Sequence, residues 1–213
     1  MRRIAEDSPE ASRIILGLLD AVEQDRAHSQ RHLASELGIA LGLVNAYLKR
    51  CVKKGLVKVR QAPARRYAYY LTPHGFTEKS RLTVEYLSYS FGFFRQAKTD
   101  CSELFRRAKA SGVASVLLVG QSDLAEIAAL CAMEQAINII GLVQSDAKQA
   151  RFIGLPVFPG FDAVAESFDS ILITDQNNSR ATCEAAVARF GAERVLVPEL
   201  LRVRIRQQGG AAE

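Results

Sequence analysis

The residues best suited to chemistry follow an apolar strand, at the turn in VLLVGQSDLA (residues 116–125). A strand that ends in glycine and leads into a helix can hold a phosphate, because glycine permits the tight turn and the helix N-terminus attracts anions. Gly120 and Ala125 fit the first and third positions of the G-x-G-x-x-G/A spacing, but Ser122 replaces the second glycine. Asp123 adds a negative charge where a phosphate would approach. The turn therefore predicts an altered site that disfavours a tightly held pyrophosphate.

Further polar residues follow the other predicted strands. INIIGLV is followed by Gln144, where a dinucleotide site would carry an acid for the ribose hydroxyls, and Asp146 comes two residues later as a substitute. Ligands of parallel sheets sit at the carboxyl ends of the strands. We therefore predict one ligand site, formed by Gly120, Gln121, Ser122, Asp123, Gln144, Asp146 and Thr174.

Residues 113–213 alternate short apolar strands with helical segments, which is typical of a parallel sheet with helices on both faces. We expect an α/β, Rossmann-like domain with strands at SVLLVG, INIIGLV, LPVF, SILIT and RVLVP, and helices at DLAEIAALCAMEQA, FDAVAESF and SRATCEAAVARFG. All three histidines precede this domain, and no paired carboxylate or activated nucleophile converges on the strand ends. We therefore expect no catalytic residues and no enzyme activity.

Charge divides the chain. The formal net charge is +5, but Lys and Arg counted against Asp and Glu give +9 for residues 1–112 and −4 for residues 113–213. Glu36 and Glu78 enclose a stretch without any acidic residue, and the basic residues within it are Lys49, Arg50, Lys53, Lys54, Lys58, Arg60, Arg65 and Arg66. A solvated helix face normally mixes signs, so this stretch indicates a polyanion partner.

The basic stretch lies among segments typical of a winged helix-turn-helix. PEASRIILGLLDAVEQ has apolar residues at helical spacing, Ser29 is expected to cap a second helix that Gly38 ends, and ALGLVNAYLKRCVKKG predicts a third. LVKVRQ and RYAYYL, joined by the basic APAR, then predict a hairpin wing whose Arg side chains reach the DNA backbone or minor groove.

Over roughly residues 10–90 these segments resemble the MarR-type winged-helix regulators associated with exopolysaccharide gene clusters. The resemblance implies that the helix from about Ala40 enters the major groove and that Asn45 contacts a base edge, since its amide can pair bidentately with adenine. Ala40 replaces the usual Ser or Thr cap and Leu43 the usual polar residue, so we expect few base contacts and more shape readout. The implied DNA-binding residues are Ser29, Gln30, Leu41, Gly42, Asn45 and Lys49, with Arg60, Arg65 and Arg66 in the wing. A winged helix used for protein contacts is the alternative.

Between Thr72 and Gly112 no strong break occurs, which predicts one long helix. Its stripe follows the a/d spacing of a two-helix seam, apolar except for Lys98: Val84, Leu87, Phe91, Phe94, Lys98, Cys101, Phe105 and Ala108. We expect a homodimer, because one winged helix covers only a half-site and two held together bind jointly. The alternative is that the stripe packs on its own domains.

Residues 113–198 resemble two groups, partly through FIGLPVFPGFDAVAESFDSILIT. One is the NAD(H)-binding half of the Rex redox repressors, which also join a winged helix to a Rossmann domain. The other is the small nucleotide-sugar-binding domain of bacterial sugar acyltransferases. These resemblances imply that the domain binds a nucleotide. The alternative is a domain that has lost its ligand and serves oligomerisation.

The four cysteines lie far apart among apolar neighbours, which indicates reduced, buried thiols. His28, His32 and Glu36 have metal-ligand spacing, but the Ser29 cap leaves His28 outside the helix, and we expect no metal site. We find no apolar run of membrane-spanning length and no signal-peptide pattern at the N-terminus, and we therefore expect a cytoplasmic protein without membrane contact.

The sequence thus predicts a dimeric DNA-binding transcriptional regulator with a winged-helix domain (1–72), a connecting helix (73–112) and a Rossmann-like regulatory domain (113–213). The expected partners are double-stranded DNA, a second copy and a nucleotide or nucleotide-sugar effector, and standard NAD is disfavoured. The alternatives are a Rex-like NAD(H) sensor, and a nucleotide-sugar enzyme or accessory protein with a winged-helix docking domain.

Overall fold

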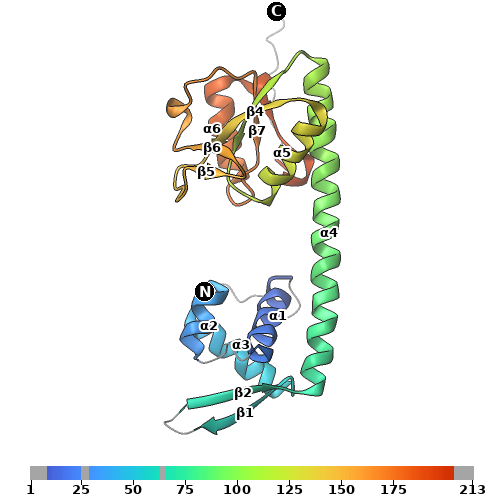
Figure 1. Ribbon diagram of the computed structural model, residues 1–213, viewed down its shortest axis with the longest axis vertical. Helices are drawn as coiled ribbons and strands as arrows, with labels where there is room; N and C mark the ends of the chain where they lie inside the picture. Colours follow the sequence, from blue (N-terminus) through green and yellow to red (C-terminus); the bar gives the residue numbers. More distant parts are fainter. Residues whose placement is uncertain (1–8, 25–28, 63–65, 204–213) are drawn as a thin grey trace, which may run out of the picture. The chain divides into compact units, whose positions relative to one another are not determined.

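A computed structural model describes residues 9–24, 29–62 and 66–203 (Figure 1). The chain divides into two compact units, Met1–Phe91 and Gly92–Glu213, and helix α4 (Pro73–Ala110) contributes residues to both. The predicted division at residues 72 and 112 stays a prediction. Within the described ranges, no helix combines the length and the apolar character needed to cross a membrane.

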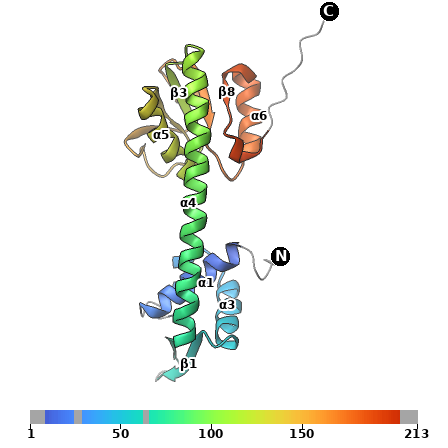
Figure 2. The ribbon, with the colours of Figure 1, turned by 90° about the vertical axis from the view of Figure 1, so that its right-hand side faces the viewer.

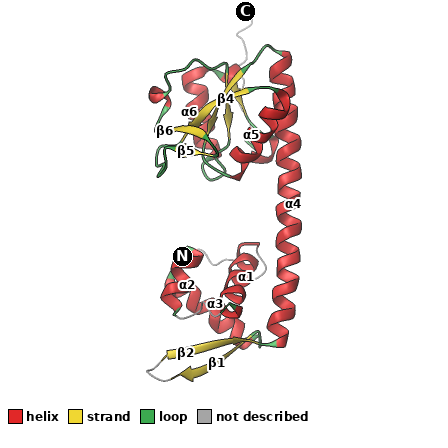
Figure 3. Cartoon of the chain, viewed as in Figure 1, coloured by secondary structure: helices red, strands yellow, loops and turns green. Residues whose placement is uncertain are grey.

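The first unit is a three-helix cluster followed by a hairpin: α1 (Pro9–Glu23), α2 (Gln30–Leu37), α3 (Leu41–Lys53), β1 (Val57–Ala62) and β2 (Arg66–Leu71) (Figure 3). Ser29 caps α2 by accepting a hydrogen bond from the His32 N–H at 3.1 Å, and Gly38 ends it in the left-handed conformation at φ 64°, both as predicted. The apolar faces of the three helices meet in one core, whose fully buried members include Leu18, Leu19, Leu33, Val44 and Leu48.

The start of α4 is fixed to the base of the hairpin. The Thr72 hydroxyl accepts the Gly75 N–H at 2.9 Å and donates to the Gly55 carbonyl at 2.6 Å. A Cβ at position 75 would lie 2.0 Å from the Leu56 carbonyl oxygen, so only glycine allows this approach. Lys79, one turn later, forms ion pairs with Asp20 and Glu23 of α1.

The second unit contains a six-stranded sheet in the order β5-β6-β4-β3-β7-β8. The strands β3 (Ser115–Val119), β4 (Asn138–Val143), β6 (Leu155–Phe158), β7 (Ser170–Ile173) and β8 (Val195–Leu196) are parallel, and β5 (Arg151–Phe152) pairs antiparallel at the edge. From β3 the chain builds outward to β4 and β6, then returns to the other side of β3 for β7 and β8. This is the 3-2-1-4-5 order of doubly wound sheets, and it confirms the predicted parallel-rich α/β arrangement in outline.

Helices cover both faces of this sheet. Alternate residues of β3 point to opposite sides: Val116 and Leu118 pack in one core with α5 (Asp123–Gln135) and the C-terminal part of α4 (Figure 2). Leu117 and Val119 pack in another core with α6 (Ser179–Phe190). The strands are apolar on both faces because both faces are buried.

One predicted helix does not form. FDAVAESF was expected to be helical, but the structure has only the 3₁₀ turn η2 (Phe161–Ala163). Phe161 and Phe168 both pack edge-on against Phe190 of α6, with ring centroids 5.0 and 5.5 Å apart. These tertiary contacts partly bury the aromatic rings without a helix, and they override the local apolar spacing. Two further 3₁₀ turns, η3 (Ala192–Arg194) and η4 (Glu199–Leu201), flank β8.

The predicted long helix forms and ends near Gly112, which has φ 88°. Its apolar stripe divides into two parts. The C-terminal part is buried: Cys101 and Phe105 belong to the core of the second unit, and Ala108 is 6% exposed. The remaining apolar positions keep 41–64% of their surface exposed: Val84, Leu87, Phe91 and Phe94. The alternative of packing on the chain's own domain therefore applies to the C-terminal part alone.

Candidate functional site

The most exposed face of α3 lies opposite its buried residues. Val44, Tyr47, Leu48 and Cys51 are buried in the core of the first unit, and burial raises the pKa of the Cys51 thiol to about 11. The four predicted DNA-contacting residues of this helix lie off that buried side: Leu41, Gly42 and Lys49 are exposed, and Asn45 is half-buried. Ala40 precedes the helix and gives it no side-chain cap, as its residue type implies.

Basic residues surround this face. Lys49, Lys53, Lys54, Lys58 and Arg60 are exposed, and none forms an ion pair with a described carboxylate. The Arg60 guanidinium lies 5.9 Å from the centre of the Tyr70 ring, across the antiparallel hairpin. Unneutralised cations on one helix and the adjoining hairpin provide what a phosphate backbone requires.

Two predicted phosphate contacts also have structural roles. The Ser29 hydroxyl oxygen is the α2 cap, and the Gln30 side-chain amide donates to the Tyr69 hydroxyl at 3.2 Å. Because Tyr69 belongs to β2, this hydrogen bond connects the helix-turn-helix to the wing. The sequence alone predicted both residues as DNA contacts but gave no signal of this connection.

Three predicted residues are only partly described or not described. Arg66 begins β2, where its backbone pairs with Ala62. Arg65, at the predicted wing tip, and His28, of the metal-spacing pattern, lie outside the described residues. His32 Nε2 lies 3.9 Å from the Glu36 carboxylate, and the described part of the chain contains no cluster of three or more potential metal ligands.

The turn after β3 is held by hydrogen bonds. The Gly120 φ of 102° is a conformation that favours glycine, and the Thr174 hydroxyl donates to the Gly120 carbonyl at 2.6 Å. Gln121 N–H donates to the Gln144 side-chain oxygen at 2.8 Å. Ser122 caps α5: its hydroxyl oxygen accepts the Ala125 N–H at 3.3 Å and donates to the Thr174 carbonyl at 2.6 Å. Two donor groups of this turn that could bind a phosphate, the Gln121 N–H and the Ser122 hydroxyl, are therefore already hydrogen-bonded.

A cavity of about 460 Å³ lies beside this turn, between the start of α5 and the loop after β4. Its lining includes most of the predicted ligand residues: Gln121, Ser122, Asp123, Gln144 and Asp146. The sequence analysis missed the others, which are Glu126, Ala147, Lys148, Gln149 and Phe152. Glu126 follows Asp123 by three residues, so helical spacing could have placed it on the same face. The lining carries three carboxylates against one lysine.

Thr174 does not line the cavity. It is fully buried, and its hydroxyl lies within hydrogen-bonding distance of the Val119 and Gly120 carbonyls. The next residue, Asp175, organises the loop before α6. Burial acts to raise the pKa of its carboxyl, but hydrogen bonds from the Asn178 N–H, the Thr182 hydroxyl and the Asn177 N–H outweigh burial and lower it. This end of β7 is therefore a structural junction.

A standard dinucleotide does not fit these residues. The Gln121 N–H is occupied by Gln144, Ser122 fills the second glycine position, and Asp123, Glu126 and Asp146 would repel a diphosphate at the cavity. Gln144 donates a hydrogen bond to Asp146, so the two polar side chains after β4 form one unit. They can bind hydroxyl or amide groups of a neutral ligand portion.

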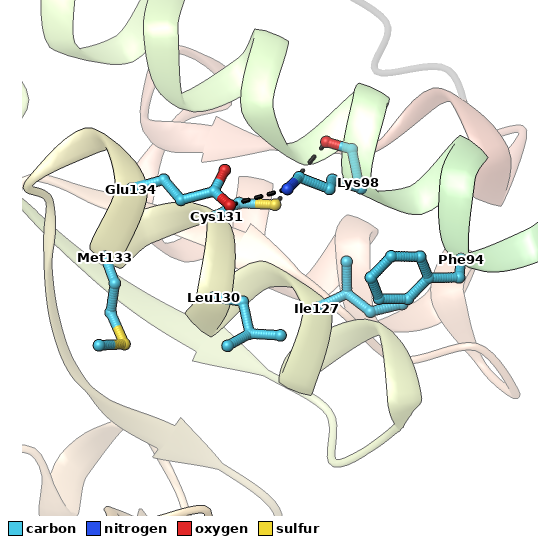
Figure 4. Close-up of a pocket in the computed structure, with 7 residues that line it drawn as sticks. All are labelled: Phe94, Lys98, Ile127, Leu130, Cys131, Met133 and Glu134. Carbon is cyan, nitrogen blue, oxygen red and sulfur yellow. Dashed lines mark hydrogen bonds and ion pairs between the residues drawn. The ribbon is translucent and has the colours of Figure 1, made fainter.

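A second concavity of about 240 Å³ lies between α4 and α5 in the same unit (Figure 4). It has mainly apolar walls, Phe94, Ile127, Leu130, Cys131 and Met133, and the ion pair of Lys98 with Glu134 at 2.7 Å borders it. Leu130 and Met133 keep 55% and 78% of their surface exposed. This surface adjoins the exposed end of the α4 stripe at Phe94.

Comparison with known families identifies the first unit. Residues 12–58 match the winged helix-turn-helix DNA-binding family. This match covers α1, α2, α3 and the start of β1, and it confirms the predicted winged-helix DNA-binding domain. The finer assignment to the MarR type is not tested by it.

Comparison with curated proteins found no match. Among solved structures, one similar to this chain is the O-methyltransferase NcsB1 from neocarzinostatin biosynthesis in complex with S-adenosyl-L-homocysteine. It is 16% identical, the similarity covers 89% of this chain and 81% of that one, and the TM-score is 0.35.

NcsB1 is an enzyme, so the comparison contradicts our expectation that the chain is not one, and we withdraw that exclusion. A likeness at this TM-score assigns no reaction, substrate or cofactor to the chain.

Proposed function

We propose that the chain is a MarR-type transcriptional regulator that binds double-stranded DNA as a homodimer. The observation that carries the proposal is the exposed, cationic side of α3 and the hairpin, within a unit of winged helix-turn-helix DNA-binding type. In such domains the second helix of the motif enters the major groove, and the wing contacts the adjacent backbone. Here α3 and the β1–β2 hairpin take these roles.

Different residues have different roles in this interface. Lys49 and Arg60 neutralise phosphates and fix the position of the protein on the duplex. Asn45 is suited to an adenine edge, because its amide N–H can donate a hydrogen bond to N7 while its side-chain oxygen accepts one from the N6 amino group. Gln30 keeps the wing in register with α2 through Tyr69.

Salt titration tests the proposal. Binding of the full chain to a duplex of mixed sequence should weaken steeply with salt, because each phosphate contact contributes about −0.9 to the log–log slope. Lys49→Ala should flatten that slope by about one unit. Arg180→Ala, which removes a highly exposed cation from α6, is the control and should leave it unchanged. No binding at low salt, or a slope independent of Lys49, would contradict the proposal.

The homodimer is supported by the exposed half of the α4 stripe. Val84, Leu87, Phe91 and Phe94 follow one another at steps of three and four, and each keeps 41% or more of its surface exposed. Large apolar side chains repeated along one side of a long helix are suited to a second helix of the same kind. Two winged helices held in this way would bind two half-sites jointly.

The cavity beside Gln144 favours a second, regulatory function. It lies beside the carboxyl ends of β3 and β4, and ligands of Rossmann-like sheets bind at the carboxyl ends of the strands. We infer that it takes the nucleoside part of a nucleotide or nucleotide-sugar effector. Gln144 and Asp146 would contact its hydroxyl groups, and the phosphates would lie away from Asp123 and Glu126.

Titration calorimetry of the full chain with NADH and with UDP- and GDP-sugars tests this inference. The resemblance of the first unit to exopolysaccharide-associated regulators makes a sugar nucleotide the favoured class. Gln144→Ala should abolish the binding without changing affinity for DNA in the absence of effector. Tight NADH binding would contradict our argument from Gln121 and Ser122, and no binding by any nucleotide would favour a domain that serves assembly alone.

A further inference from the structure

Over the first two turns of α3, the centre of its outward face carries little hydrogen-bonding capacity. The buried side of α3 consists of Val44, Tyr47, Leu48 and Cys51. Since successive residues of a helix are rotated by about 100°, a different set of residues lies on the opposite side. That set is Gly42, Ala46, Lys49 and Lys53, all exposed. Asn45 lies at its flank and is half-buried. The first two turns of the helix thus present no side chain larger than a methyl group at the centre of this face.

Small size permits a close approach. A Cβ added at Gly42 would meet nothing within 4 Å, so open space lies above this position, and the absence of a side chain is not required by packing inside the unit. Gly42 and Ala46 are four residues apart and therefore adjacent on the helix surface. Lys49 and Lys53 follow on the next turns, where their long side chains can reach phosphates on either side of a groove.

The methyl group of Ala46 has one matching partner in the major groove. Thymine alone presents a C5-methyl group there, and apolar side chains such as alanine distinguish it by contact. Among these four positions only Lys49 and Lys53, on the later turns, could read a base by hydrogen bonds, at guanine O6 and N7, whereas Gly42 and Ala46 at the centre carry no side-chain donor or acceptor. Specificity at the centre of the face is therefore apolar.

We propose that Ala46 packs against a thymine methyl group in each DNA half-site and is a specificity-determining residue. This inference rests on the proposed DNA-binding function and adds the chemistry of the base that is recognised. Gly42 allows the helix backbone to come close enough for that contact, and Lys49 and Lys53 hold the helix at that depth through phosphates.

Replacement of thymine by uracil tests the contact, because it removes the methyl group and changes no hydrogen-bonding group. The probe is a duplex selected by the full-length chain from a randomised pool, in which each thymine is then replaced in turn. At one thymine per half-site, replacement by uracil should weaken binding of the wild-type chain to the duplex about fourfold, which is the value for one buried methyl group.

For the Ala46→Gly variant, the affinities for the duplex with thymine and the duplex with uracil at that position should be equal, so that their ratio falls to one. Any general loss of helix stability affects both duplexes equally and cancels in the ratio. Ala185→Gly makes the same change at an exposed position of α6 and should keep the wild-type ratio.

Two outcomes separate this inference from the proposed function. If the chain selects a sequence but no thymine replacement weakens binding, or if Ala46→Gly keeps the wild-type ratio, the methyl contact is wrong and DNA binding stands. If the chain binds no duplex at low salt, the DNA-binding function fails, and this inference fails with it.

Discussion

Gly120→Ala should destabilise the second unit far more than a glycine substitution with comparable backbone strain. Gly120 has φ 102°, and a Cβ there would lie 2.5 Å from the N, Cα and Cβ atoms of Asp175. Asp175 cannot easily move away, since its N–H donates to the Val119 carbonyl at 3.0 Å and its carboxylate accepts hydrogen bonds from the following loop. Gly112 is the matched control: its φ is 88°, and a Cβ there would meet nothing within 4 Å.

The expected magnitudes follow from these two geometries. An unfavourable positive φ costs of order 1–3 kcal/mol at either position. Overlap with the Asp175 backbone adds about 1–3 kcal/mol at Gly120 alone. At about 2–4 °C per kcal/mol for a chain of this size, Gly120→Ala should melt roughly 2–12 °C below Gly112→Ala.

Thermal unfolding followed by circular dichroism measures this difference, and DNA binding by the first unit serves as the control for intact folding of that unit. If the two variants have the same melting temperature, the backbone at the end of β7 moves to accommodate the added methyl group, and the packing argument for Gly120 is refuted. If Gly120→Ala also loses a nucleotide that the wild type binds, the close packing and the ligand site depend on the same turn.

Three other predictions concern assembly, pH and thiols. Phe94→Asp would bury an unpaired charge in the dimer seam and should convert the dimer into monomers or aggregates. If the wild-type chain sediments as a monomer at micromolar concentration, the seam does not exist. Hydrogen bonds from the Ala114 N–H and the Ser115 hydroxyl lower the pKa of Asp169. The stability that the ionised carboxylate contributes to the folded state is therefore present above the unfolded pKa, near 4, and is lost as the pH falls further. The melting temperature of Asp169→Asn should accordingly vary less between about pH 5 and 2 than that of the wild type. Burial raises the pKa of the Cys51 thiol to about 11. Iodoacetamide at pH 8 should therefore alkylate this thiol much more slowly in the native chain than in the urea-unfolded chain. Equal alkylation rates would contradict the burial of Cys51.

The elements of the first unit could be predicted from local signals. Ser29 and Gly38 have side-chain and backbone properties that helix ends require, and both occupy the predicted positions. The hairpin follows from alternating strands on both sides of a Pro-containing turn. Its connection to α2 through Gln30 and Tyr69 could not be predicted, because the two residues are 39 positions apart and neither type requires the other.

In the second unit, tertiary contacts decided what local patterns left open. The apolar spacing of FDAVAESF suits a helix, yet the half-buried Phe161 and Phe168 rings pack against Phe190, which the sequence does not place beside them. The α4 stripe has the same limit. Its a/d spacing is continuous, but Phe105 packs in the core of its own unit and Phe91 remains exposed, so spacing alone does not distinguish an internal from an external partner.

The glycine of the predicted phosphate turn illustrates why motif spacing overstates a ligand. Gly120 fits the first position of a dinucleotide fingerprint, but its lack of a side chain is also required by the backbone of Asp175, 55 residues later in the chain. A glycine that packing already explains is no evidence for a phosphate. The information about a ligand therefore lies in the polar side chains that line the cavity, chiefly Gln144, which also accepts the Gln121 N–H, and Asp146. Their paired side chains and the neighbouring carboxylates favour hydroxyl groups over phosphate, which is why the effector test depends on Gln144 and not on the glycine.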